Sequence, residues 1–382
     1  MSSDPPRRRL SNRSVRSEAI IRTLSSQFRP GLRLLLLLAV VATTMTACAS
    51  VDVQSGVFAI YTENGTPSRI GEPVGIPVWS PIGNSLAWGS EDGLFLHSLD
   101  ASEVRRLSAS PVAGVPGWSP DGTKLAFVDR DRVALIVLDV GSGAEQFTQP
   151  LDHLRRNNAE FPLLAFGGPA WAPDGSQIAF VCWDGAGDEI CLISSNGTGW
   201  RQVTRLERQR TAGQTVSSQP GPAAANAGPP AWSPSGDLLA VAVYPERPGA
   251  PTGIFLVDPA EGVGRRVSSL QPNSAATWSP DGGSILFSAF RRGRSDVFRV
   301  VLADFTQRRV TEELPEGSRN PAFSPDGTRI AVETSGGIVV LGEQGTSRAF
   351  GVPGLRCAYP SWSSDGSVIA IAATSNPIAS YN

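Results

Sequence analysis

Histidine and lysine are nearly absent from this sequence of 382 residues. It contains two histidines, His97 and His153, and one lysine, Lys124, among 33 basic residues. A histidine-based metal centre or a Ser-His-Asp triad needs side chains that converge, and the two histidines fall in different parts of the chain. The G-x-S-x-G elbow of serine hydrolases is absent as well. We therefore predict no metal site, no cofactor and no catalytic residues.

Charge is also scarce. Asp, Glu, Lys and Arg together make up 18% of the residues and nearly balance, with a formal net charge of −2. No broad basic face is expected, so nucleic acid is not a predicted partner. Eight arginines stand within residues 1–33, and the chain after residue 47 has 25 basic and 33 acidic residues. The body of the protein is therefore mildly acidic, with no general attraction to anionic lipid.

Long apolar runs are missing. The longest, Leu34–Ala42, has nine residues, too few to cross a bilayer, which takes about 20. The arginines before it and the small residues after it predict an export signal over residues 1–47. The segment that ends in Ala47-Cys48 resembles a bacterial lipoprotein box, which implies cleavage before Cys48 and acylation of its thiol. Ordinary cleavage after Ala49 and an uncleaved signal anchor are the alternatives. The expected location is extracytoplasmic, at the outer face of the cell membrane or in the periplasm.

A single phrase, Trp-Ser-Pro-Asp-Gly, occurs seven times with small changes. Each copy is followed by two variable residues and a short apolar run. Successive copies start 39 to 61 residues apart, a period typical of propellers and solenoids. The proline and glycine of the phrase predict a tight turn, and the apolar run predicts a strand. The copies begin at Trp79, Trp118, Trp171, Trp232, Trp278, Phe323 and Trp362.

Each repeat divides into four strands, which is the content of one propeller blade. We predict an all-β, seven-bladed β-propeller over residues 55–382, joined to the signal by a short tether at residues 48–54. Residues 56–70 parallel the third and fourth strands at 337–349, whereas little sequence follows the last repeat. The last blade should therefore combine two N-terminal and two C-terminal strands, which leaves no unpaired edge. The connection at 205–229, rich in Gly, Pro, Ala, Ser and Gln, predicts a flexible loop.

The repeated phrase and the apolar residues after it, such as Leu125–Phe127, resemble the WD-like repeats of the TolB family. The resemblance covers about residues 55–372 and implies a propeller. TolB itself has an α/β domain ahead of six blades, and similar repeats precede the hydrolase domain of prolyl oligopeptidases; neither extra domain is expected here. The predicted function is a non-catalytic, monomeric scaffold that binds an envelope protein, a peptide or another ligand. The alternative is a propeller-type hydrolase or lyase that acts on carbohydrate or peptide.

Polar residues at the start of the innermost strands mark a candidate binding site. Most repeats have glycine there, whereas the late repeats carry Asn273, Ser274, Arg319, Asn320 and Tyr359. Side chains of this kind at the mouth of a central channel could bind a small anion or a peptide terminus. Solvated strand ends are the alternative interpretation.

Two cysteines flank an expected hairpin. If Ala186-Gly187 forms a two-residue turn, Cys182 lies directly opposite Cys191, and such a pair is close enough for a disulfide. Disulfides persist in exported proteins, so we predict this bridge; two buried thiols are the alternative. Cys357 is left over and is expected to be a small buried residue.

The remaining conspicuous residues have structural interpretations. An aspartate in a Pro-x-Gly turn caps that turn, so the repeated aspartates are not predicted to form a metal or acid site. The motif aromatics occur once per repeat and are expected to pack between blades. The arginine cluster Arg291–Arg294 falls in a turn between the second and third strands of its repeat. It is expected to be solvated, or to contact an anionic partner from the same face as the long loops.

Overall fold

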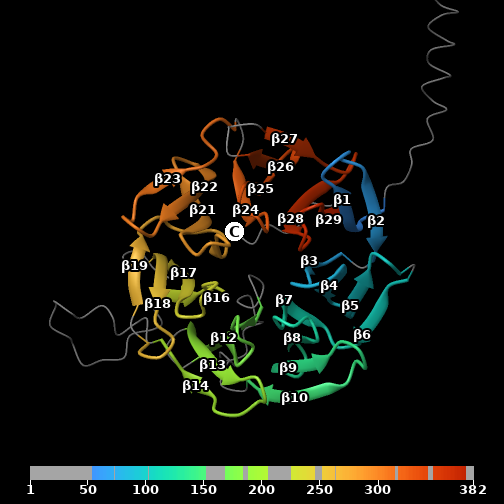
Figure 1. Ribbon diagram of the computed structural model, residues 1–382, viewed down its shortest axis with the longest axis vertical. Coiled ribbons are helices and arrows are strands. Elements are labelled where there is room, and N and C mark those ends of the chain that lie inside the picture. The colour runs from blue at the N-terminus through green and yellow to red at the C-terminus, as the bar shows by residue number, and fades with distance from the viewer. Residues whose placement is uncertain are drawn as a thin grey trace, which may run out of the picture. The chain divides into compact units, whose positions relative to one another are not determined.

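The computed structural model describes residues 54–72, 74–101, 103–151, 168–183, 188–204, 225–245, 252–262, 264–314, 317–342 and 347–375. All regular elements in these ranges are strands, and they form seven antiparallel sheets around a central axis (Figure 1). The chain is therefore a seven-bladed β-propeller, which confirms the predicted fold class. Within the same ranges there is no helix of the length and apolarity needed to span a membrane. The predicted signal, Cys48 and most of the loop 205–229 lie outside the described residues.

Blades 1 to 3 follow one another along the chain, and in each the strands run in sequence order from the axis outward (Figure 1). Blade 1 comprises β3 (Ile76–Trp79), β4 (Ser85–Ser90), β5 (Gly93–Ser98) and β6 (Arg105–Ser108). Blade 2 comprises β7 (Val112–Trp118), β8 (Lys124–Asp129), β9 (Ala134–Asp139) and β10 (Glu145–Pro150). Blade 3 comprises β11 (Ala170–Trp171), β12 (Gln177–Trp183), β13 (Asp188–Ser194) and β14 (Arg201–Gln202).

Blades 4 to 6 repeat this order, except that the inner edge of blade 4 is split into two short strands. There, β15 (Ala225–Ala227) and β16 (Ala231–Trp232) both pair with β17 (Leu239–Pro245), which is followed by β18 (Gly253–Val257) and β19 (Gly264–Ser268). Blade 5 comprises β20 (Thr277–Trp278), β21 (Ser284–Arg291), β22 (Arg294–Val301) and β23 (Gln307–Arg309). Blade 6 comprises β24 (Ser318–Phe323), β25 (Arg329–Thr334), β26 (Gly337–Gly342) and β27 (Ser347–Phe350).

Blade 7 closes the ring with strands from both ends of the chain. Its order is β28 (Arg356–Trp362), β29 (Val368–Thr374), β1 (Gly56–Tyr61) and β2 (Pro67–Gly71), and Figure 1 shows the blue N-terminal strands beside the red C-terminal ones. Six residue pairs join β1 to β29, from Gly56 opposite Ala373 to Tyr61 opposite Val368. The predicted sharing of the last blade is therefore confirmed. The whole ring lies within Gln54–Asn382, a compact unit distinct from Met1–Val53, so we expect it to fold without residues 1–53.

The ring has two faces with different contents. In each blade the first strand runs to the motif turn, the second returns, and the third starts from the face where the first began. We call the face where the innermost strands begin the mouth face, marked by Val112, Ser318 and Arg356. The opposite face, marked by motif turns such as Ser119–Gly122, is the turn face. The hairpins between second and third strands lie on the mouth face, and so does the start of β1 at Gly56.

The repeated phrase forms a tight turn held by its own side chains. The Ser119 hydroxyl donates to Oδ1 of Asp121 at 2.6 Å, and the same oxygen accepts from the Thr123 N–H at 3.1 Å. Gly122 has φ of 67°, which favours glycine because it has no Cβ. These hydrogen bonds, that from Ser119 foremost, hold the pKa of the Asp121 carboxyl below its usual value. The motif aspartate therefore serves the turn.

A hydrogen bond from each motif tryptophan ties its blade to the one before. In the preceding blade, the acceptor is the carbonyl of the residue just before the motif aromatic. Apolar side chains also pack between blades: Val137 of blade 2 and Phe180 of blade 3 belong to one buried cluster. Six bonds of 2.9 to 3.2 Å form this series: Trp79 to Ser361, Trp118 to Val78, Trp171 to Gly117, Trp232 to Ala170, Trp278 to Ala231 and Trp362 to Ala322.

The seam between blades 5 and 6 lacks this bond because its motif aromatic is Phe323, which has no N–H. The Arg299 guanidinium lies over the Phe323 ring instead, 5.7 Å from its centroid. A cavity of about 610 Å³ lies at the same seam, lined by residues of both blades. This joint is therefore built differently from its six neighbours.

Cys182 and Cys191 are joined by a disulfide, with their Cα atoms 5.8 Å apart. The predicted register of this hairpin is wrong, however, since Cys182 lies opposite Glu189 and Cys191 lies opposite Phe180. Pairing stops at Trp183 and Asp188, so four residues separate the strands instead of two. The cysteines are diagonal neighbours on one face of the sheet, a placement that side chains can still bridge.

Deletion of residues 358–382 should abolish cooperative unfolding, because it removes β29 and leaves β1 without its inner partner. The measurement is thermal unfolding followed by circular dichroism. Deletion of residues 376–382 alone is the matched control, since it leaves every described strand in place, and it should melt like the full chain. A cooperative transition at an unchanged temperature in the longer deletion would contradict the closure.

The substitution Trp118→Phe should lower the free energy of unfolding by about 1 kcal/mol, because it removes the N–H that bonds to the Val78 carbonyl of the preceding blade. The matched change is Phe323→Trp, which offers an N–H to the one seam without it and should raise stability by up to about 1 kcal/mol. Urea titration of both variants measures the two effects. Equal stability of Trp118→Phe and the parent would refute a role for the indole bond.

Candidate functional site

A cavity of about 330 Å³ opens at the mouth of the central channel, between the innermost strands of blades 1, 2, 5, 6 and 7. The five candidate residues from the sequence all line it: Asn273, Ser274, Arg319, Asn320 and Tyr359. The structure thus brings together side chains that are up to 86 positions apart in the sequence.

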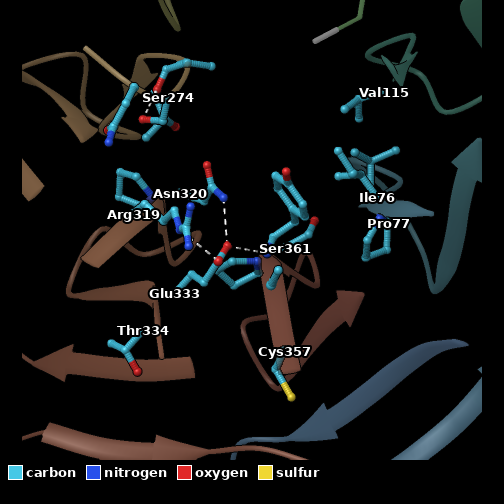
Figure 2. Close-up of a pocket in the computed structure, with 18 of the residues that line it drawn as sticks. Ile76, Pro77, Val115, Ser274, Arg319, Asn320, Glu333, Thr334, Cys357 and Ser361 are labelled. Atoms are coloured by element: carbon cyan, nitrogen blue, oxygen red, sulfur yellow. Dashed lines mark hydrogen bonds and ion pairs between the residues drawn. The ribbon is translucent and has the colours of Figure 1, made fainter. Parts of the chain in front are cut away.

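Glu333, on β25, is the central residue of this site and was not predicted. Its carboxylate lies between its neighbours in Figure 2, and its side chain is only 12% exposed. Oε1 forms an ion pair with Nε of Arg319 at 3.1 Å, and Oε2 accepts a hydrogen bond from Nδ2 of Asn320 at 2.8 Å. The Tyr359 backbone N–H also points to Oε2, at 3.4 Å. One buried carboxylate therefore contacts three of the five predicted residues.

The sequence does contain a signal for Glu333. In the six other repeats, the residue ten positions after the motif aromatic is small, aliphatic or hydroxyl-bearing. Such a residue suits packing near the axis. Only the repeat that starts at Phe323 has a charged residue at this position. The residues in the equivalent positions are Gly89, Val128, Val181, Ala242, Ser288 and Ala372. When the seven repeats are aligned on the motif aromatic, Glu333 stands out as the one charged residue at this position.

The backbone around the cavity has an unusual conformation. Asn320 and Tyr359 have φ of 48° and 53°, in the left-handed region that residues other than glycine seldom occupy. Both stand three residues before the motif aromatic, at bulges where the register of β24 and β28 shifts. A bulge redirects the side chains beside it. Backbone strain of this kind tends to occur at binding sites, where the surrounding structure holds it in place.

The charges that line the cavity are two arginines, Arg319 and Arg356, and one carboxylate, Glu333. Burial raises the pKa of Glu333 above its ordinary value of 4.5, although the hydrogen bond from Asn320 and the charge of Arg319 act in the opposite direction. The Arg319 side chain is 39% exposed and Arg356 is exposed. When Glu333 is ionised the lining has a net charge of +1, so it favours an anionic group.

Other candidate chemistry is not concentrated at one place. Within the described ranges, no group of three or more His, Cys, Asp or Glu side chains is arranged to hold a metal ion. His97 lies on β5, and His153 is outside those ranges. Cys357 also lines the cavity. Burial raises the pKa of its thiol, and its sulfur accepts a hydrogen bond from the Val352 N–H at 3.3 Å.

The raised pKa of Glu333 predicts a pH-dependent difference between the parent and Glu333→Gln. Because the folded state holds this proton more tightly than the unfolded state, ionisation of Glu333 costs stability. The parent should therefore lose stability relative to Glu333→Gln as the pH rises from about 4.5 to the higher folded value. Urea midpoints between about pH 4 and pH 7 test this. A difference that stays constant, or that changes in favour of the parent, would show that burial does not dominate.

Comparison with known proteins agrees with this architecture. A family model for the TolB β-propeller domain matches residues 169–379. TolB from Acinetobacter baumannii is 17% identical, with a TM-score of 0.44 over 82% of this chain and 66% of that one. An oligogalacturonate lyase in complex with manganese is 14% identical, with a TM-score of 0.54 over 85% of this chain and 92% of that one.

The oligogalacturonate lyase of Vibrio parahaemolyticus is 11% identical, with a TM-score of 0.56 over 84% of this chain and 98% of that one. At such identities the lyases show a shared propeller fold and do not indicate a shared activity. The family model, in contrast, covers more than half of the chain. This protein therefore belongs to the family of TolB β-propeller domains.

Proposed function

We propose that this protein is an exported, lipid-anchored binding protein of the bacterial cell envelope, and that its ligand binds at the mouth of the channel. The observation that carries the proposal is the buried carboxylate of Glu333, held by Arg319, Asn320 and the Tyr359 N–H at the edge of a cavity. Burial of a charge is costly unless it is paired. A structural role alone does not require a charged residue here, since the other six repeats have none.

The proposed ligand is a small molecule or peptide end that carries an anionic group. Glu333 engages Nε of Arg319, and the terminal nitrogens of the same guanidinium remain as donors for a carboxylate. Arg356 adds a second positive charge at the rim. A volume of about 330 Å³ lies at the lower end of the range for small-molecule sites, which suits one residue or a short peptide terminus.

The envelope location rests on the leader. Arginines, a short apolar core and Ala47-Cys48 make up a signal of lipoprotein type, and acylation of Cys48 would hold the mildly acidic body at a membrane. The intact mass of the mature protein tests this directly. A chain that begins at an acylated Cys48 supports the anchor, and a chain that begins at Ser50 refutes it.

Binding without turnover is the proposed activity, with a propeller-type hydrolase or lyase as the alternative. Glu333 is the carboxyl group at this cavity that an enzyme of this kind could use as its acid or base. Both of its oxygens already have partners in the protein, Oε1 in an ion pair with Arg319 and Oε2 in a hydrogen bond from Asn320. This arrangement suits the positioning of neighbouring donors better than proton abstraction. Recovery of the bound ligand in chemically altered form, with alteration lost in Glu333→Gln, would favour the enzyme.

A photo-cross-linking residue at Tyr359 should capture the ligand in native envelopes. The same residue at Ile82, which is 55% exposed on the turn face, is the control and should capture nothing. Arg319→Ala should weaken capture about tenfold or more, because it removes a charge-assisted hydrogen bond. Arg308→Ala, at an exposed arginine on β23, should leave capture unchanged. Equal capture by Arg319→Ala, in a variant that melts like the parent, would refute the site.

A further inference from the structure

The hairpin between β21 and β22 projects further from the mouth face than the hairpins of comparable turn length. Its strands pair from Ser284 opposite Val301 as far as Arg291 opposite Arg294, thirteen residues beyond the motif aromatic. In blades 1 and 6 the corresponding pairs end eleven residues beyond it, at Ser90 and Thr334. At about 3.4 Å per residue, the two additional residues extend the tip by about 7 Å.

The tip combines an exposed aromatic ring with two exposed arginines. Phe290 is 52% exposed, although the other large apolar side chains of β21 and β22, Phe287 and Phe298, are buried. Arg291 and Arg292 are exposed and make no ion pair with any described residue. Arg294, in contrast, pairs with Asp296 at 2.8 Å. The basic charge at the tip itself is therefore not neutralised within this part of the chain.

The turn at the tip is well defined. Arg292 and Gly293 are its two central residues, with φ of 52° and 80°, values of the turn type that suits the twist of a β-hairpin. This geometry holds Phe290, Arg291 and Arg292 at one end of a regular eight-residue ladder. Their order does not depend on a ligand, and they form a preformed contact surface, which we call the tip (Phe290–Gly293).

The polypeptide enters the propeller on the same face. Gly56, the first residue of β1, pairs with Ala373 at the mouth-face end of β29. Cys48 precedes Gly56 by eight residues, a span of at most about 28 Å when fully extended. An acyl chain on Cys48 would therefore hold the mouth-face end of β1 within about 28 Å of the bilayer.

We propose that the tip (Phe290–Gly293) contacts an anionic lipid bilayer and turns the mouth face of the propeller toward the membrane. The proposal rests on the acylation of Cys48 given under the proposed function. Arginine side chains are attracted to anionic headgroups over about one Debye length, and an aromatic ring partitions into the interface. Although the body as a whole is mildly acidic, the protein needs only this local contact once the tether has brought it to the surface.

The test uses the propeller, residues 54–382, tethered by an N-terminal His tag to vesicles that contain a nickel-chelating lipid. This tether replaces the acyl group, so the result does not depend on acylation. An environment-sensitive label is placed at Arg292→Cys or, as the control on the turn face, at Ile82→Cys. With phosphatidylglycerol in the vesicles, a quencher on the lipid headgroups should reduce the fluorescence at position 292 several-fold more than at position 82.

Charge is tested separately, in the labelled Arg292→Cys protein. Adding Arg291→Glu should lower the ratio of membrane-bound to free tip by about 30-fold, given the attraction per basic residue, whereas Arg308→Glu should change nothing. Equal quenching at positions 292 and 82, or quenching unaffected by Arg291→Glu, would overturn the proposal. The basic tip would then be explained by a soluble anionic partner. An unacylated Cys48 in the mature protein would refute the anchor without altering the vesicle result.

Discussion

The bond from an indole N–H to the carbonyl of the preceding blade is the interaction on which the ring depends. Among the described residues every backbone ladder ends within its own sheet, so the hydrogen bonds that join one blade to the next involve side chains. Six bonds of nearly equal length fix both the distance and the rotation between neighbours. The repeated tryptophan is thus explained by what it donates as well as by the area that it buries.

The candidate site lies where the repeats depart from this regularity. Blades 5, 6 and 7 differ from the others at the channel mouth, where polar side chains replace small ones and two residues adopt left-handed backbone conformations. The hydrogen bonds of Glu333 reach both Asn320 in blade 6 and the Tyr359 N–H in blade 7. A single carboxylate therefore links the two bulges. A ligand that displaced one of its donors would change the position of the carboxylate and so its hydrogen bond to the other donor.

The fold could be predicted from the sequence because its period is a local property. Each Trp-Ser-Pro-Asp-Gly copy specifies a turn and the strand after it, and the count of copies gives the count of blades. The starts of the inner strands are also local to the motif, which is why Asn273, Arg319, Asn320 and Tyr359 could be placed at one channel mouth.

The features that the sequence did not predict correctly depend on contacts between strands. Glu333 comes from a second strand, and its role follows from its position opposite Arg319, which no spacing within one strand reveals. The hairpin of Cys182 and Cys191 has a four-residue connection where composition suggested two. Turn length changes the register of every pair that follows it, yet the two cysteines remained on the same face of the sheet.

Closure by the shared blade also sets the order in which the protein can fold. The partner of β1, strand β29, begins about 310 residues later in the chain, so ribosomes that add about 5–20 residues per second need roughly 15–60 s to supply it. During that interval Val57, Phe58 and Ile60, all buried in the finished ring, have only strand β2 to pair with. Every new copy of this protein thus passes through a period with an apolar N-terminal strand exposed, and cellular factors that delay its aggregation would determine how much of it reaches the closed state.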